Sequence, residues 1–204
     1  DVIATRDLPP HDNSAMDGYA VRAEDSQSAS ADQPAVSTIT EEIPAGKSPT
    51  QTLEPGQSAR IFTGGIVPPG ANSVIMQENT TRIDTDTVHI LEPAIVGRHI
   101  RRAGEDVTRG HVVIAASTEL GPGGIAMLAA QGIAEVEVHR RPVVSVIPTG
   151  SELCEVGQPL EPAQIYNSNA MMLEAQLIRA GAIPKRCAIV PDDQDALVRA
   201  LQEA

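Results

Sequence analysis

The spacing of apolar positions predicts that the first half of the chain is built from β-strands. From Asp12 to about Gly97, short apolar runs alternate with Gly, Pro, Asn and Asp, a pattern typical of a β-rich module with turns between its strands. Glu24–Pro34, rich in Ser, Ala and Asp, is expected to be a surface loop. The expected strands are Tyr19–Val21, Val36–Ile43, Ser58–Thr63, Ser73–Gln77 and Thr87–Ile90.

After this module the pattern first predicts a short apolar helix. Ile125–Gln131 is a good helical run, with Pro122 at a favourable first-turn position and Gly132 able to take the left-handed conformation that ends a helix. The alternation of Val136 and Val138 then predicts a half-buried strand.

The last part of the chain predicts the order strand, helix, strand, helix. The β-branched run Val143–Ile147 is typical of a strand buried on both faces, and Lys185–Val190 is the second expected strand. One helix is expected from an N-cap at Asn167–Asn169 through Ala180, with Gly181 closing it, and Asp192–Asp193 are expected to cap the next. This order predicts a parallel sheet, which two strands alone would leave with an open edge and low stability.

Charge and composition exclude several classes of partner. The chain has 15 Lys and Arg against 27 Asp and Glu, a net charge of −12, which disfavours binding to nucleic acid or to anionic membranes. It also has only two Tyr, one Phe and no Trp, so it offers no run of rings on which bases could stack. With 41% hydrophobic residues, we expect a folded protein with a core of aliphatic side chains.

The sequence carries no sign of export or of a metal site. No apolar run approaches the length of a membrane span, and Asp1–Pro10 contains no hydrophobic signal region. Two cysteines and five scattered histidines show neither disulfide nor zinc-ligand spacing, so the histidines are expected at the surface and the protein in the cytoplasm. Because the chain lacks an initiator Met, we expect it to begin inside a longer polypeptide or after processing.

The most informative candidate site from position alone is Thr149–Glu152. It follows a predicted parallel strand, and open α/β sheets bind ligands at the carboxyl ends of their strands, although a plain turn explains it equally well. Asn13–Ala20 and the glycine pair after Ile61–Thr63 have turn or bulge explanations of the same kind. Pro44–Ser48 is not a phosphate-binding loop, since Pro49 directly after it disfavours the required helix.

A last cluster places paired carboxylates beside guanidinium groups. Gly104–Asp106 follows Arg101–Arg102, a combination most often found as a solvated or salt-bridged surface.

Taken together and in this order, the motifs resemble the MoeA-type molybdopterin molybdenumtransferases, the molybdenum-insertion enzymes whose family includes the gephyrin E domain. The resemblance covers essentially the whole chain. It rests on Leu8–Pro10, Asp12–Ala20, Ile43–Gly46, Ile61–Gly64, Pro68–Ala71, Val74–Glu78, Arg101, Gly104–Asp106, Pro142, Thr149–Leu153 and Gln164–Asn169.

The resemblance implies a cytoplasmic homodimer that takes adenylylated molybdopterin and molybdate, releases AMP and inserts molybdenum, assisted by a divalent cation, expected to be Mg. By the same resemblance, catalytic roles fall to Asp17, Thr63 and Glu152, with the first two facing the α/β domain of the other subunit. Substrate-binding roles fall to Ser14, Thr149, Gly150, Ser151, Asn169 and Asp106. No residue is assigned as a metal ligand.

The implied fold is a multidomain α/β and β protein: an inserted β-rich module and an incomplete MogA/MoaB-like α/β molybdopterin-binding domain. The expected parts are a linker region (1–10 and 106–140), the inserted module (11–105) and the first half of the α/β domain (141–204). Because the family's N-terminal helical segment, later glycine-rich loop and C-terminal β-domain are missing, we expect a fragment. A non-catalytic dimeric scaffold or a molybdopterin-binding protein of the same fold stays open as an alternative.

Overall fold

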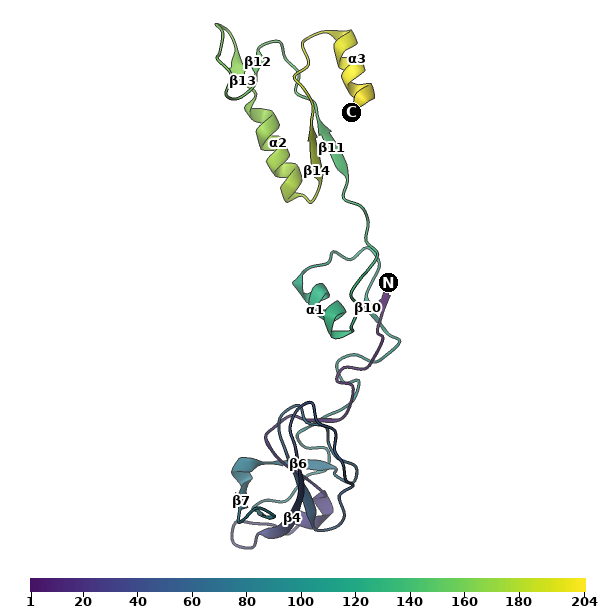
Figure 1. The fold of residues 1–204 in the computed structure, drawn as a ribbon, viewed down its shortest axis with the longest axis vertical. Helices are drawn as coiled ribbons and strands as arrows, with labels where there is room; N and C mark the ends of the chain where they lie inside the picture. Colours follow the sequence, from purple (N-terminus) through teal and green to yellow (C-terminus); the bar gives the residue numbers. More distant parts are fainter. The chain divides into compact units, whose positions relative to one another are not determined.

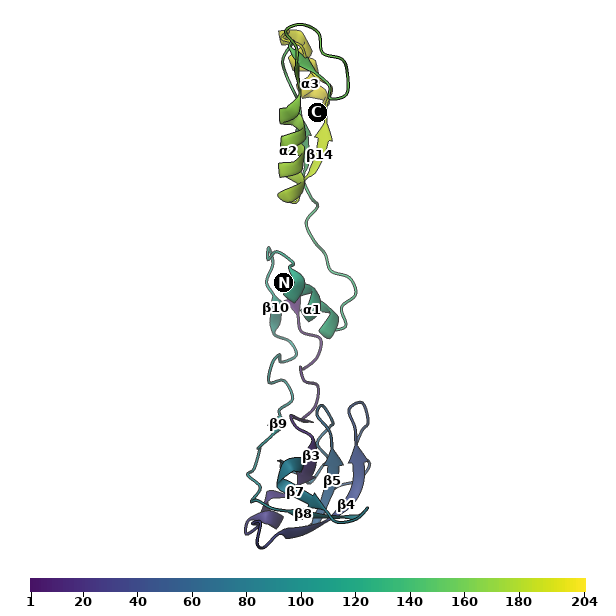
Figure 2. The same cartoon turned by 90° about the vertical axis from the view of Figure 1, so that its left-hand side faces the viewer.

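The computed structural model describes residues 1–204 and separates them into two units, Asp1–Glu135 and Val136–Ala204, each described by itself. Figures 1 and 2 show the elements of both. The first unit contains β1 (Val2–Ile3), β2 (Asn13–Ser14), β3 (Gly18–Val21), η1 (Ala23–Ser26), β4 (Ala35–Ile43), β5 (Gln57–Ile61), β6 (Ser73–Met76), η2 (Gln77–Asn79), β7 (Thr80–Arg82), β8 (Thr87–Ile90), β9 (Ile100–Arg101), β10 (Val112–Ile114) and α1 (Pro122–Ala130).

A six-stranded sheet forms the centre of the β-module, with strand order β6-β3-β5-β4-β8-β7. All neighbours are antiparallel except β4 and β5, which are parallel. The five predicted strands are all present, although β5 begins at Gln57 and ends at Ile61 rather than Thr63. Pro44–Ser48 lies in the connection between β4 and β5 and forms a turn, in which the Lys47 amide donates to the Pro44 carbonyl at 3.1 Å. It is not followed by the helix that a phosphate-binding loop requires.

Both faces of this sheet are covered, because successive side chains of a strand point to opposite sides. In β3, Tyr19 and Val21 pack in one apolar cluster while Ala20 packs in the other. Part of the first cluster comes from the segment 24–34, which we expected to be a surface loop. That expectation was wrong in part: Ala29 is only 4% exposed, and the buried Ser26 hydroxyl accepts a hydrogen bond from the Ala94 amide.

The two chain segments that leave the module run antiparallel and pair with each other. β2 pairs with β9, Leu8 bridges Val107, and β1 pairs with β10. The predicted helix is present as α1, with Pro122 in its first turn and a left-handed Gly132 (φ 71°) after it. The buried Gln131 joins α1 to the first strand segment, because its Oε1 accepts hydrogen bonds from the amides of Thr5 (2.8 Å) and Arg6 (3.2 Å).

The second unit contains the predicted strand, helix, strand and helix, together with two short strands between the first strand and the first helix that were not predicted. Its elements are β11 (Val143–Val146), β12 (Leu153–Cys154), β13 (Ile165–Tyr166), α2 (Ser168–Arg179), β14 (Ile183–Arg186) and α3 (Gln194–Glu203). β11 and β14 are parallel, as expected. The side chains of Asn167 and Asp193 accept hydrogen bonds from Ala170 and Ala196, so both predicted helix caps are confirmed.

Three details of this unit differ from expectation. Val136 and Val138 form no strand, because no neighbouring segment pairs with them and alternation alone supplies no backbone partner. Val143 is 63% exposed, so β11 is not buried on both faces; its sheet has two strands and α2 packs against it. The second strand begins at Ile183 and ends at Arg186, with only a single further bridge, between Thr149 and Val190.

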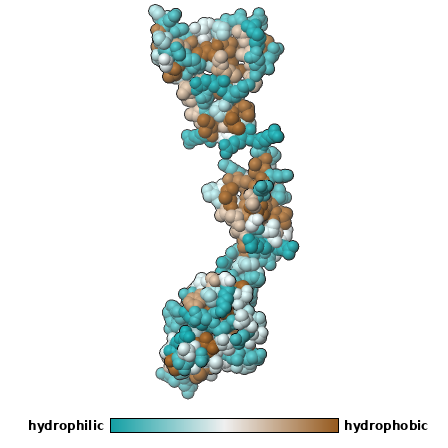
Figure 3. All heavy atoms as spheres, viewed as in Figure 1, coloured by the Kyte–Doolittle hydropathy of each residue, from teal (hydrophilic) through white to brown (hydrophobic).

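The β-module and the second unit differ in the polarity of their surfaces. On the face drawn in Figure 3 the β-module is mostly hydrophilic, whereas apolar side chains reach the surface of the second unit. Those side chains include Met171, Ile178, Val198 and Leu201 on α2 and α3. None of the helices combines the length and the apolar composition that crossing a bilayer requires.

Candidate functional site

In the β-module, Asp17 and Thr63 are in direct contact. The Thr63 backbone nitrogen and its Oγ1 both donate to Oδ1 of Asp17, each at 2.8 Å. Asp17 immediately precedes β3, and Thr63 lies two residues after β5. Because β3 and β5 are antiparallel neighbours, with Gly18 opposite Ile61, the start of one strand meets the end of the other and brings the two side chains together.

Gly18 makes the close approach at this corner possible. A Cβ atom added to Gly18 would lie 1.9 Å from the carbonyl oxygen of Ile75 on the neighbouring strand β6, so no other residue fits without a shift of the backbone. The backbone oxygen of Asp17 is held as well, since it accepts a 3.0 Å hydrogen bond from the Gln77 amide. Asp17 is therefore held at its side chain by Thr63 and at its backbone by Gln77.

The surroundings of Asp17 favour its charged form. The Thr63 amide is the largest cause that lowers the pKa of Asp17 below its ordinary value of 3.8, followed by the Thr63 hydroxyl, and the positive charge of Arg60 acts in the same direction. Since Oδ1 accepts both bonds from Thr63, Oδ2 is left to orient a water molecule or a substrate donor.

Ser14 braces the same corner from inside. It is 1% exposed, its Oγ donates to the Met16 carbonyl at 2.6 Å, and its backbone exchanges hydrogen bonds with Gly64 and Gly65 at 2.9 Å each. A Cβ on Gly65 would lie 2.7 Å from the Ile43 oxygen, so the glycine pair reflects close backbone packing at a corner. The geometry gives Ser14 a bracing contact beside Asp17 and Thr63.

Asp106 belongs to a separate ionic cluster. Arg101 donates to Asp106 (2.6 and 2.7 Å) and to Glu105 (3.0 Å), and the Asp106 side chain is 54% exposed. Asp106 and Glu105 raise the pKa of Arg101. This confirms the expected salt-bridged surface. A neighbouring pair, Arg102 and Asp12 (2.6 Å), links this surface to the chain just before β2.

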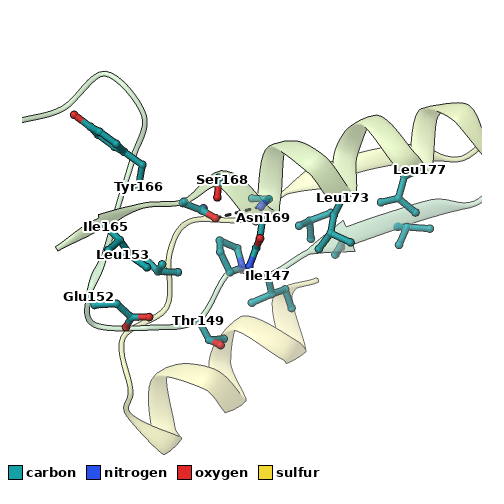
Figure 4. A pocket seen from close by; sticks show the side chains of 16 residues that line it. Ile147, Thr149, Glu152, Leu153, Ile165, Tyr166, Ser168, Asn169, Leu173 and Leu177 are labelled. Carbon is teal, nitrogen blue, oxygen red and sulfur yellow. Dashed lines mark hydrogen bonds between the residues drawn. The ribbon is translucent and has the colours of Figure 1, made fainter. Parts of the chain in front are cut away.

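The second unit contains a pocket of about 530 Å³ between β11, the start of α2 and the segment after Thr149 (Figure 4). Three of the predicted residues line it: Thr149, Glu152 and Asn169. Figure 4 shows Thr149 and Glu152 on one side and Leu173 and Leu177 of α2 farther along. The pocket therefore combines a few polar groups with apolar walls, which suits a ring system that carries polar substituents.

Gly150 and Ser151 are not part of that lining. Gly150 has φ 147°, and a Cβ there would lie 2.6 Å from Oε2 of Glu152, so the glycine allows the Glu152 carboxylate to lie against the backbone. The Ser151 amide donates to Asp192 Oδ2 at 3.1 Å, and its Oγ accepts from the Asp192 amide at 3.0 Å. The hydrogen bonds between Ser151 and Asp192 hold the loop that carries Thr149 and Glu152 in place.

Asn167 adds a polar group that we had predicted only as a helix cap. It is 3% exposed and lines the pocket; its Oδ1 accepts from the Ala170 amide at 3.2 Å, while its Nδ2 is buried without a hydrogen-bond partner. His99 also departs from expectation, because its Nε2 is buried rather than at the surface. The local sequence around Arg60 and Asp192 does not reveal their roles at the site, because their contacts join segments far apart in the chain.

The side chains do not make a metal site by themselves. No group of three or more His, Cys, Asp or Glu side chains could hold a metal ion. Asp17 and Glu152 each present a single carboxylate and belong to different units. The donor set of this chain thus does not fit a complete magnesium site.

Comparisons with known families match both units. Residues 1–132 match the family described as "MoeA N-terminal region (domain I and II)", and residues 145–204 match the "Probable molybdopterin binding domain". The chain belongs to the MoeA family.

Named relatives and a solved structure agree with this assignment. A molybdopterin molybdenumtransferase of Nostoc sp. is 43% identical over 203 residues, which are 100% of this chain and 46% of that protein. Molybdopterin molybdenumtransferase 2 of Mycobacterium tuberculosis is 46% identical over 193 residues, 95% of this chain and 47% of that protein. The crystal structure of the molybdopterin biosynthesis MoeA protein from Pyrococcus horikoshii OT3 matches with a TM-score of 0.92 and 38% identity, over 100% of this chain and 54% of that one.

The chain spans about half the length of the curated relatives that it matches. The mixed α/β fold with its separate β-module agrees with the fold class expected from the sequence.

Proposed function

We propose that this chain forms part of a molybdopterin molybdenumtransferase, which converts adenylylated molybdopterin and molybdate into molybdenum cofactor with release of AMP. The observation that carries the proposal is the 43% identity to a protein of that name along 100% of the chain. The anchored, charged Asp17 and the part-polar pocket in the second unit support it.

In this proposal the protein's own groups orient the reactants. Release of AMP by hydrolysis forms a bond from a water oxygen to a phosphorus atom and breaks the phosphoric anhydride bond. It frees two protons to solvent at a pH where both phosphate monoester products are dianions. Such a reaction depends on positioning and charge stabilisation more than on a covalent nucleophile. Asp17 would orient the water through its carboxylate, Thr63 would hold that carboxylate, and Glu152 would contact polar substituents of the substrate.

The remaining assignments complete the proposal. Thr149 and Asn169 bind the substrate in the pocket, and Gly150 and Ser151 shape its edge. Ser14 braces the corner that carries Asp17 and Thr63, and Asp106 binds the substrate from its own ionic cluster. The protein acts as a cytoplasmic homodimer in which Asp17 and Thr63 face the α/β domain of the other subunit, and magnesium assists, held by groups additional to those of this chain. The partners are the two substrates and a second copy of the protein.

The test is AMP release from adenylylated molybdopterin, with and without molybdate, by the full-length protein. We expect molybdate-dependent release in the wild type, and loss of release in Asp17→Ala with the fold intact. Asp32→Asn changes an exposed carboxylate elsewhere in the β-module and should leave release unchanged.

Three other results would each contradict part of the proposal. Wild-type turnover by Asp17→Ala would remove Asp17 from the mechanism. Binding of adenylylated molybdopterin without AMP release would favour a binding protein, and a stable dimer that neither binds nor releases would favour a scaffold.

A further inference from the structure

We propose that Arg60 is a positioning residue that fixes Asp17 and Thr63 for the reaction; this rests on the proposed function. Arg60 lies on β5 and is half-buried. Nothing in the sequence pattern singles it out, since its partners come from three different segments of the β-module.

The guanidinium of Arg60 is held by four neighbours. Its Nη1 donates to the Gly18 carbonyl at 2.9 Å, and its Nη2 donates to Oε1 of Gln77 at 2.7 Å. Its central carbon lies 5.3 Å from the ring centroid of Tyr19 and 4.6 Å from that of Phe62. Arg60 thus contacts two of the three aromatic residues of the chain.

Each neighbour is connected to the Asp17–Thr63 pair. Gly18 follows Asp17 and Phe62 precedes Thr63 in the chain. Gln77 donates its backbone amide to the Asp17 carbonyl, at 3.0 Å. One side chain therefore links the strand that carries Asp17, the segment that carries Thr63 and the residue that holds the Asp17 backbone.

The chemistry of these contacts requires arginine rather than any cation. A planar guanidinium can donate in two directions while it lies against aromatic rings, whereas a lysine ammonium is a compact point charge without that planar fork. The charge of Arg60 also helps to lower the pKa of Asp17, so the same side chain supports both the position and the charge of the carboxylate.

The test compares Arg60→Gln and Arg60→Lys with Arg82→Gln in the full-length protein. Arg82 is a matched control: it is an exposed arginine of the same module that donates to two backbone carbonyls, those of Asp84 and Thr85, and touches neither Asp17 nor Thr63. The readouts are kcat and KM for molybdate-dependent AMP release, hydrogen exchange of the Thr63 amide, and the pKa of the Asp17 carboxyl by NMR.

With cooperative unfolding retained, we expect Arg60→Gln to lower kcat on the order of ten- to a hundredfold with little change in KM. Exchange of the Thr63 amide should become faster and the pKa of Asp17 should rise. Arg60→Lys should bring the pKa of Asp17 closer to its wild-type value than it brings kcat, because lysine keeps the positive charge but lacks the planar guanidinium.

Two outcomes would overturn the proposal. One is an Arg60→Gln protein whose kcat and Thr63 exchange match those of Arg82→Gln; the other is full recovery of kcat by lysine. If the wild type releases no AMP, the proposed function fails, but Thr63 exchange and the Asp17 pKa still decide whether Arg60 positions the pair. If Arg60→Gln does not fold, Arg60→Lys carries the same comparison.

Discussion

Asp192 and Ser151 hold each other through two reciprocal hydrogen bonds. The Ser151 amide donates to the Asp192 carboxylate at 3.1 Å, and the Asp192 amide donates to the Ser151 hydroxyl at 3.0 Å. The pair joins the loop that carries Thr149 and Glu152 to the segment that leads into α3. The Gly150 amide adds a third link, to the Val190 carbonyl at 3.0 Å.

We expect Asp192→Ala to loosen this loop without unfolding the protein. The change leaves the Ser151 amide without its acceptor, and a lost side-chain hydrogen bond of this kind costs about 1 kcal/mol. The Ser151 amide should exchange faster with solvent, and AMP release by the full-length protein should fall, because Glu152 follows directly on the loosened residue.

Asp195→Ala is the control for that experiment. Asp195 lies in the first turn of α3 and is exposed, so its removal costs only a weak interaction with the helix end. Equal exchange rates at Ser151 in both variants would mean that Asp192 does not brace the loop.

Gly18→Ala should strongly destabilise the first unit. The new Cβ would lie 1.9 Å from the Ile75 oxygen, and relief of that overlap requires the strands to separate at the position next to Asp17. We expect a loss of about 3 kcal/mol or more in the free energy of unfolding, measured by urea titration. In Gly123→Ala no atom lies near the new Cβ, and helix propensity predicts a gain of up to about 1 kcal/mol. Equal effects at the two glycines would contradict the described packing of β3 on β6.

Acid should weaken the β-module through Asp12 and Asp17. The Ala103 amide is the largest cause that lowers the pKa of Asp12, and Thr63 acts in the same way on Asp17; both pKa values lie below the ordinary 3.8. The unfolded chain binds these protons first as the pH falls, so the stabilisation is complete well above 3.8 and is lost as the pH drops through the lowered folded-state values.

The measurement is the urea midpoint between about pH 6 and pH 2.5, a range that spans ordinary and lowered carboxyl pKa values. The double variant Asp12→Asn, Asp17→Asn should start less stable and should lose less on acidification than the wild type, whereas Asp32→Asn should follow the wild-type curve. Parallel curves for the double variant and the wild type would show that these two carboxylates do not drive the acid loss.

Gln131→Ala should release the first strand segment from α1. The buried amide side chain accepts from the Thr5 and Arg6 amides and donates to the Arg6 carbonyl at 3.3 Å, so alanine leaves several backbone groups without partners. We expect a cost of about 1–3 kcal/mol and faster hydrogen exchange at Thr5 and Arg6. Gln51→Ala, at an exposed position, should leave the free energy of unfolding unchanged. Equal unfolding free energies for the two variants would show that Gln131 does not join α1 to the first strand segment.

Local signals in the sequence predicted much of the fold. Asn167 and Asp193 cap their helices as expected, because a cap depends on residues three positions apart that are visible in the sequence. The long strand β4 was found from its apolar and β-branched run. Val136 and Val138 show the limit of this reasoning, since alternation predicts a strand only where another segment supplies a partner.

Contacts between distant segments could not be predicted in the same way. β1 and β10 have only two and three residues and pair across most of the first unit, so neither has a periodic pattern of its own. Asp17 and Thr63 were proposed through a family resemblance, whereas their two hydrogen bonds follow from the pairing of β3 with β5. The roles inferred for Arg60 and Asp192 depend entirely on such pairings.

The antiparallel pairing of β1 with β10 and of β2 with β9 affects how the first unit can fold. Val2 pairs with Ile114, and bringing such distant residues together in a flexible chain carries a loop-closure cost. In the folded β-module, β2 and β9 are paired side by side. The loop that must close when Val2 meets Ile114 is then short, because the module already holds its two ends together. The module thus takes the place of a hairpin turn, and a two-residue turn substituted for it should let Leu8 and Val107 pair as before.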